Sequence, residues 1–186
     1  MTNPDDTLLY KKRHNITIND IQHSLYYYFD YDERSFDINM PFQHFHSFYE
    51  LMILISPQAY HLVEGIPYSI RSGDIVLLRP SVLHRSEYQK GAPSKRLIIG
   101  FLYPPSLWGM PETYQKLFEP FYSPLPIFRF PSKQQQLINE KLNRIYRYSF
   151  QDEEPELKSL IVHGMFVEFL YTLRQLAPLT PIPMNH

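Results

Sequence analysis

The sequence predicts a mainly β protein, an antiparallel sandwich or small barrel, followed by a C-terminal pair of α-helices. Before Pro104 the chain consists of many short apolar runs separated by turn residues, which is typical of antiparallel sheets. After Pro131 the apolar residues recur at helical spacing instead. With 186 residues, the chain is long enough to bury the core of one domain.

The strands are predicted from apolar runs and from the turns between them. Residues 16–31 alternate weakly and then become rich in tyrosine, which favours one or two strands. Ser72-Gly73-Asp74 predicts a turn between two later strands, and Pro80 ends the second of these. The further strands that we expect are residues 50–55, 60–63, 68–71, 74–78 and 96–103.

Two helices are expected after a proline-interrupted segment that allows only short helical turns. The first helix runs to about Tyr148 and carries one apolar stripe. The second begins near Pro155, runs to about Leu176 and is apolar on more than one side. A helix of this kind has two sides to bury, one on its own domain and one on something else.

Composition excludes several classes of protein. The formal net charge is −1, so phosphate neutralisation cannot dominate binding, and this chain alone is a poor nucleic-acid binder. The chain has no cysteine, which excludes disulfides, thiolate metal sites and thiol catalysis. We expect no signal peptide, because the first residues place acids before bases and contain no apolar core segment. We expect no membrane-spanning helix, because no run reaches about 18 apolar residues, and a cytoplasmic location is then the default.

The segment from His44 to Glu50, HFHSFYE, carries the candidate site. In an unbroken strand His44, His46 and Glu50 would share one face, because alternate side chains point the same way. His84 is expected on a neighbouring strand. Glu50 leads into the apolar run LMILI, where a buried carboxylate needs a partner.

These four residues allow two interpretations. His44, His46, Glu50 and His84 form a ligand set that would suit iron, manganese, nickel or zinc. Alternatively, they line a metal-free pocket and hydrogen-bond to a small molecule. We favour the metal-free pocket, because a motif match alone is only a hypothesis.

The remaining polar candidates lack such neighbours. We expect His14, His23, His61 and His163 to be surface or packing residues, and Arg79 to be an exposed arginine at a strand end. The chain has only 6 glycines and no GxSxG motif, so nothing predicts phosphate binding or a serine nucleophile.

The pattern resembles that of the cupins. Their first motif, HxH followed by a glutamate, is present as His44, His46 and Glu50, and their second is present as Gly73, Pro80 and His84. More narrowly, the strings HFHSFYELMILI and YHLVEGIPYSIRSGDIVLLRPSVLH resemble the N-terminal effector-binding region of AraC-type transcription regulators. The resemblance covers about residues 40–103.

The resemblance implies a domain organisation and a set of partners. Residues 1–105 would form a cupin-like effector-binding barrel with an N-terminal arm, residues 106–176 a helical dimerisation element, and residues 177–186 a linker-like tail. The partners would be a small-molecule effector such as a sugar and a second copy of the chain. DNA would be bound only through a C-terminal domain that is absent from these residues, and no cofactor is expected.

In such regulators the N-terminal segment often moves over the pocket. That role would fall here to the stretch that ends in the aromatic residues 25–31, whose rings would close on a bound ligand or dock elsewhere when it is absent. The rival interpretation is a metal-dependent cupin enzyme, such as a dioxygenase or a sugar isomerase, in which His44, His46, Glu50 and His84 hold a divalent metal. The effector, the target operator and the choice between activator and repressor stay open, as does the choice between a fragment and a stand-alone protein.

Overall fold

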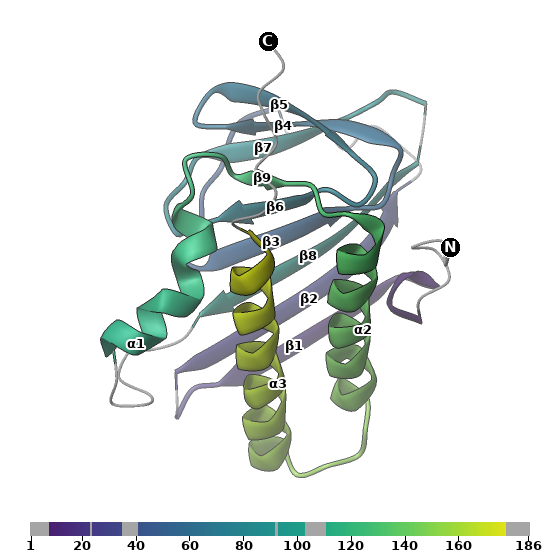
Figure 1. Ribbon diagram of the computed structural model, residues 1–186. Coiled ribbons are helices and arrows are strands. Elements are labelled where there is room, and N and C mark those ends of the chain that lie inside the picture. Colours follow the sequence, from purple (N-terminus) through teal and green to yellow (C-terminus); the bar gives the residue numbers. More distant parts are fainter. Residues whose placement is uncertain (1–7, 23, 35–40, 92, 103–110, 178–186) are drawn as a thin grey trace.

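The computed structural model describes residues 8–22, 24–34, 41–91, 93–102 and 111–177, and these residues form two antiparallel sheets and a pair of long helices (Figure 1). The six-stranded sheet has, in spatial order, β1 (His14–Asp20), β2 (Leu25–Arg34), β8 (Ser94–Leu102), β3 (Tyr49–Leu54), β6 (Ile75–Leu78) and β9 (Ile127–Phe128). The three-stranded sheet has β5 (Ile66–Arg71), β4 (Gln58–Val63) and β7 (His84–Tyr88). The helical segments are η2 (Leu8–Tyr10), α1 (Pro111–Gln115), η4 (Lys116–Tyr122), α2 (Ser132–Ser149) and α3 (Pro155–Leu176).

Strand β3, in the middle of the six-stranded sheet, is buried on both faces, which explains why it is apolar at every position from Leu51 onward. Along β3, Met52 and Leu54 belong to the core between the two sheets. Leu51 and Ile53 belong to the other core, between the large sheet and the helices. The candidate site therefore has to lie on the same face as Met52, because side chains alternate along a strand.

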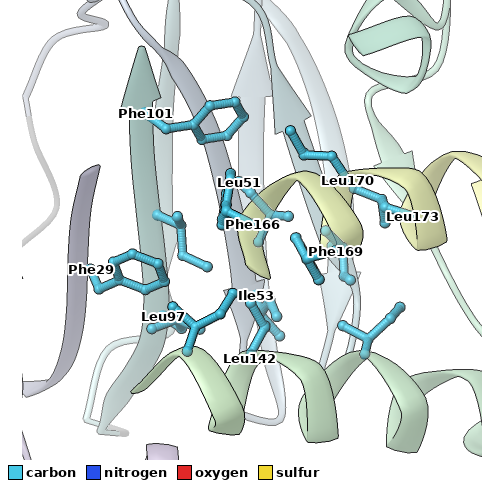
Figure 2. Packing of buried hydrophobic residues seen from close by; sticks show 14 of the residues in the cluster. Phe29, Leu51, Ile53, Leu97, Phe101, Leu142, Phe166, Phe169, Leu170 and Leu173 are labelled. Carbon is cyan, nitrogen blue, oxygen red and sulfur yellow. The ribbon is translucent and has the colours of Figure 1, made fainter. Parts of the chain in front are cut away.

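Helices α2 and α3 lie side by side across the outer face of the large sheet (Figure 1). Figure 2 shows Phe166 and Phe169 of α3 and Leu142 of α2 directed toward sheet residues such as Phe29 and Leu97. Each of these side chains is almost completely buried. Burying a side chain of this size stabilises the fold by about 1.5–3 kcal/mol, so this layer is a major source of stability.

The predicted fold class is confirmed: antiparallel sheets are followed by a C-terminal pair of helices. Residues 16–31 form two strands, β1 and β2, and residues 111–122 of the proline-interrupted segment form the short helices α1 and η4. The strand expected to carry His84 is β7, whose range was not predicted from the sequence, and the two-residue strand β9 was not predicted. Of the expected features, Tyr103 and residues 178–186 of the linker-like tail lie outside the described residues.

The aromatic stretch at residues 25–31 does not form a lid. It lies in β2, which pairs with β1 on one side and β8 on the other. Tyr27, Phe29 and Tyr31 are buried in the core beneath the helices. For these three rings the expectation that they close over a ligand is therefore wrong, because moving them would break two strand pairings and the packing of α3.

Helix α3 has the second apolar side that its sequence predicts. Leu157, Leu160, Ile161 and Tyr171 are exposed, and Leu160 keeps 59% of its accessible surface. Positions three, four and seven residues apart lie on one side of a helix, so these residues form a stripe that faces away from the sheet. No helix of the described part of the chain is both long and apolar enough to span a membrane.

Candidate functional site

Three imidazoles meet between the two sheets. The backbones of His44 and His84 form an isolated antiparallel bridge, with both N–O distances at 2.9 Å. The ring centroids of His44 and His84 lie 4.4 Å apart, and those of His46 and His84 lie 4.7 Å apart. The structure therefore brings together all three histidines that the sequence singled out.

The local backbone differs from the predicted one. Strand β3 begins only at Tyr49, so the alternation of an unbroken strand does not place His44 and His46. Instead the bridge to His84 positions His44, and the backbone N–H of Ser81 donates to the carbonyl of His46 at 2.8 Å. The prediction that the three histidines converge was correct, but the bridge between His44 and His84 brings them together, not the alternation of one strand.

The ring of His46 is held by an aromatic neighbour and by a carboxylate. The Phe48 ring stacks on it, with centroids 4.3 Å apart and planes 8° apart. His46 Nε2 lies 2.9 Å from Glu50 Oε2. Phe48 in turn occupies the space beside Gly100, where the Cβ of any larger residue would lie 2.8 Å from the ring. Gly100 is thus required for the close approach of Phe48.

Glu50 is buried, with 5% of its surface accessible, and its carboxylate has the partners that a buried charge needs. Besides the contact with His46, Oε1 lies 3.8 Å from His84 Nε2. Burial by itself raises the pKa of Glu50, but the hydrogen bond from His46 and the nearby histidines outweigh it and hold the pKa below its ordinary value. Glu50 therefore carries a negative charge into the cluster.

His84 presents one nitrogen to the interior. Its Nδ1 lies 2.8 Å from the carbonyl of Val82, which can only accept, so Nδ1 carries the proton. The lone pair of the neutral ring is then on Nε2, which is buried and has no hydrogen-bond partner among the described residues. Burial lowers the pKa of His84, which favours this neutral form.

His61 is a member of the cluster, although its sequence context predicted a surface or packing residue. Its ring stacks near that of His84, at 5.7 Å between centroids, and its Nδ1 lies 2.9 Å from Ser86 Oγ. Burial lowers the pKa of His61 to about 3, so the ring is neutral at physiological pH. The alternation of the strand could have predicted this position, because His61 lies on the same face of β4 as Ala59 and Val63, which are both buried.

The other polar candidates lie elsewhere. His163 is buried against β2 and His14 packs beside Tyr146, as expected of packing residues. Arg79 is exposed, as predicted. His23 lies outside the described residues.

The cluster lines a small cavity of about 90 Å³. Polar side chains at its two ends come from different strands, and Met52 and Ile98 contribute apolar surface. Arg96 of β8 also lines the cavity, and it was not predicted from the sequence. Its strand is amphipathic and lysine-flanked, so nothing in the sequence distinguished Arg96 from a surface arginine.

The donor set fits a divalent metal. One nitrogen from each of His44, His46 and His84 lies within 4.8 Å of the others. Metal–nitrogen bonds of about 2.0–2.1 Å place such nitrogens roughly 3–3.4 Å apart, so the rings would close in by more than 1 Å. The bond from His84 Nδ1 to Val82 is the kind of outer contact that orients a ligating imidazole.

Comparison with known proteins identifies the family. Residues 27–155 match the family described as AraC-like ligand binding domain, which is more than half of the chain. The chain belongs to this family, and the resemblance seen in its motifs is confirmed. No curated protein matches the chain.

Solved structures with a related fold include several cupins. A cupin protein from Bacteroides fragilis is 15% identical over 45% of this chain and 70% of its own, with a TM-score of 0.37. A cupin with a double-stranded β-helix fold from Methanocaldococcus jannaschii is 17% identical over 52% of this chain and 86% of its own, with a TM-score of 0.37. The salicylate 1,2-dioxygenase of Pseudoaminobacter salicylatoxidans is 18% identical over 41% of this chain and 22% of its own, with a TM-score of 0.34.

Proposed function

We propose that this chain is the effector-sensing and dimerisation region of an AraC-type transcription regulator. It takes up a small molecule between the two sheets and passes that event to an attached DNA-binding domain. In this role the chain is not an enzyme, and it acts in the cytoplasm. Membership of a ligand-binding family and a polar cluster inside a cavity support the proposal.

One observation carries the proposal: the same strands line the cavity and support the helices. On β3, Glu50 and Met52 line the cavity, whereas Leu51 packs in the core beneath the helices. On β8, Arg96 and Ile98 alternate in the same way with Leu97 and Ile99. A ligand that shifts either strand therefore changes the surface on which α2 and α3 rest.

The coupling needs a ligand that binds one arrangement of strands and helices better than another. Two such arrangements would place attached DNA-binding domains differently on two half-sites. The second copy would bind through the exposed stripe of α3, whose Leu160 and Tyr171 lack a partner layer within the described part of the chain.

A ligand screen tests the sensing role. We expect at least one compound from a set of sugars and small metabolic acids to raise the melting temperature, because a ligand that binds only the folded state stabilises it. The gain should be lost in His84→Leu, which removes a cavity nitrogen, and kept in Arg79→Gln, which changes an exposed residue outside the cavity. A gain in melting temperature that is the same in the wild type and in both variants would contradict binding at this site.

The second candidate function is a metal-dependent cupin enzyme, which the spacing of His44, His46 and His84 favours. These histidines, with Glu50 beside them, would hold the ion, and a bound divalent metal would polarise a substrate or lower the pKa of a water. Elemental analysis of protein purified without chelators separates the two functions. Stoichiometric iron, manganese, nickel or zinc that disappears in His84→Ala would favour the enzyme, and a site that stays empty after incubation with these metals would remove it.

A further inference from the structure

The cavity has a chemical order along its length, which follows from strand register. Strand β3 pairs with β8 so that Glu50 lies opposite Gly100, Met52 opposite Ile98 and Leu54 opposite Arg96. Four residues of strand separate the level of Glu50 from that of Arg96, or about 13 Å at roughly 3.3 Å per residue. The long Arg96 side chain and the imidazole rings fill part of this length.

The facing sheet repeats the same order. On β7 the side chains of His84, Ser86 and Tyr88 follow at every second position and line the cavity. Ser86 belongs to the middle level, because its Oγ lies 3.6 Å from Met52 Sδ. The cavity therefore has a histidine and glutamate end, a middle level where Met52 and Ile98 face Ser86 and His61, and an arginine end.

Arg96 is a largely buried cation that lies near two carboxylates but makes no hydrogen bond to either of them. Only 14% of its side chain is accessible, yet its nitrogens lie 3.9 Å from Asp30 and 3.8 Å from Asp32, which is longer than a hydrogen bond. Asp32 is already engaged by Arg13 at 2.7 Å. Among the side chains that line this cavity, Arg96 is the one with a permanent positive charge. Its guanidinium still has donors to offer a ligand.

The opposite end offers different chemistry. The negatively charged Glu50 already has a contact with His46, and its charge would repel an anion placed beside it. The buried Nε2 atoms of His61 and His84 make no hydrogen bond to the described residues. A ligand at this end would therefore present a neutral hydrogen-bond donor, such as a hydroxyl, because Nε2 of the neutral His84 ring can only accept.

We propose that the effector is a small hydroxycarboxylic acid, with its carboxylate on Arg96 and its hydroxyl toward His61 and His84. This inference rests on the proposed sensing function and names its ligand class. A planar carboxylate matches the guanidinium fork with two parallel hydrogen bonds. The cavity volume of about 90 Å³ is well below the usual range of about 300–1,000 Å³ for drug-sized ligands, which favours a small molecule.

The proposal is tested by calorimetry and thermal shift with matched probes. Lactate is the expected ligand, pyruvate is the acid in which a keto group replaces the hydroxyl, lactamide is the neutral counterpart of lactate, and inorganic phosphate is the competing anion. We expect lactate to bind and to raise the melting temperature and pyruvate to bind more weakly, whereas lactamide and phosphate do not bind. This comparison uses the wild-type chain and so does not depend on a variant that folds.

Substitutions then assign the binding to Arg96. Arg96→Gln should weaken lactate binding by about ten-fold or more, because the charge and the fork are both lost. Arg96→Lys keeps the charge and should recover part of the affinity. Arg79→Gln removes an exposed arginine outside the cavity and should bind lactate as the wild type does.

Each contrary result has a distinct meaning. Equal binding of lactate and lactamide, or acid binding that survives Arg96→Gln, would overturn the carboxylate inference and leave the sensing function standing. Binding of phosphate in preference to the acids would show an anion site of another class and would also overturn it. If only sugars bind, and His84→Leu abolishes their binding, the carboxylate inference fails and the sensing function holds. If neither acids nor any other compound of the wider screen binds, both fail.

Discussion

Gly100 shows how one residue without a side chain shapes the cluster. A Cβ at this position would meet the Phe48 ring at 2.8 Å, and the Phe48 ring stacks on His46. We expect Gly100→Ala to displace Phe48, to lower the free energy of unfolding by about 1–3 kcal/mol and to change the environment of His46. Urea denaturation and the histidine signals in NMR spectra measure the two effects.

The control for this substitution is a double-mutant cycle with Phe48→Ala. If the ring is the obstacle, Gly100→Ala should cost much less in the Phe48→Ala background than in the wild type. The same cost in both backgrounds would show that the strain lies elsewhere on β8.

At the scale of elements, an ion pair fastens β9 to the turn between β5 and β6. Asp74 is fully buried and accepts two hydrogen bonds from Arg129, from Nε at 2.8 Å and from the terminal guanidinium nitrogen at 2.6 Å. The backbone N–H of Arg71 donates to the same carboxylate at 2.9 Å. Arg129 thereby ties the segment that leads into α2 to the barrel.

Arg129→Ala should lower the free energy of unfolding by about 3–5 kcal/mol, because it leaves the buried Asp74 charge without its partner. Chemical denaturation measures the loss. Arg144→Ala is the matched control: the Arg144 side chain is exposed and its pair with Glu168 is 3.9 Å long, so the expected loss is less than about 1 kcal/mol. Similar losses for both substitutions would contradict a special role for the buried pair.

A second link between elements joins β2 to α3. The hydroxyl of Tyr27 and Nδ1 of His163 lie 2.5 Å apart in an aromatic core. Burial lowers the pKa of His163 to about 4, whereas the unfolded value is about 6.5. As the pH falls from 6.5 toward 4, the unfolded chain takes up a proton that the folded chain does not, so stability is lost over this range.

We expect the pH dependence of stability to be weaker in His163→Gln. As the pH falls, the wild type should lose up to about 1.4 kcal/mol of stability per pH unit through this residue. His163→Gln should not show this part of the pH dependence, although it is less stable than the wild type at pH 7. Denaturation curves between pH 7 and pH 4.5 measure the slope. Tyr27→Phe keeps the histidine and should keep the slope, and an unchanged slope in His163→Gln would show that His163 is protonated in the folded state.

At the scale of the whole molecule, the exposed stripe of α3 predicts a dimer. Leu157, Leu160, Ile161 and Tyr171 would become buried between two copies, and apolar burial drives such association. Leu160→Glu should therefore raise the dissociation constant of the dimer by at least about ten-fold, because it places a charge in an apolar interface. Sedimentation at several concentrations measures the change.

Ile66→Glu is the control for the dimer surface. Ile66 is also about half exposed, but it lies on β5 of the small sheet, away from α3. It should sediment as the wild type does. A wild-type monomer at micromolar concentration, or dissociation by both substitutions, would contradict a dimer formed through α3.

Local patterns in the sequence determined most of the elements. Alternation and apolar runs predicted β3 and β6, and apolar periodicity predicted α2 and α3, because a half-buried element shows its buried side in the sequence. The lid assigned to residues 25–31 was wrong because a tyrosine-rich strand looks the same whether it covers a pocket or crosses a core. Only the pairing of β2 with both β1 and β8 distinguishes these.

By itself, the sequence determined the fold class, the family and the convergence of His44, His46, Glu50 and His84, since these follow from residue spacing and short motifs. The tertiary structure alone decided that His61 and Arg96 enter the same cavity, and that Phe48 and Gly100 hold the cluster in place. The physical reason is that a strand has two faces, and which of them becomes the interior depends on how two sheets pack. That choice is made by contacts between residues far apart in the chain.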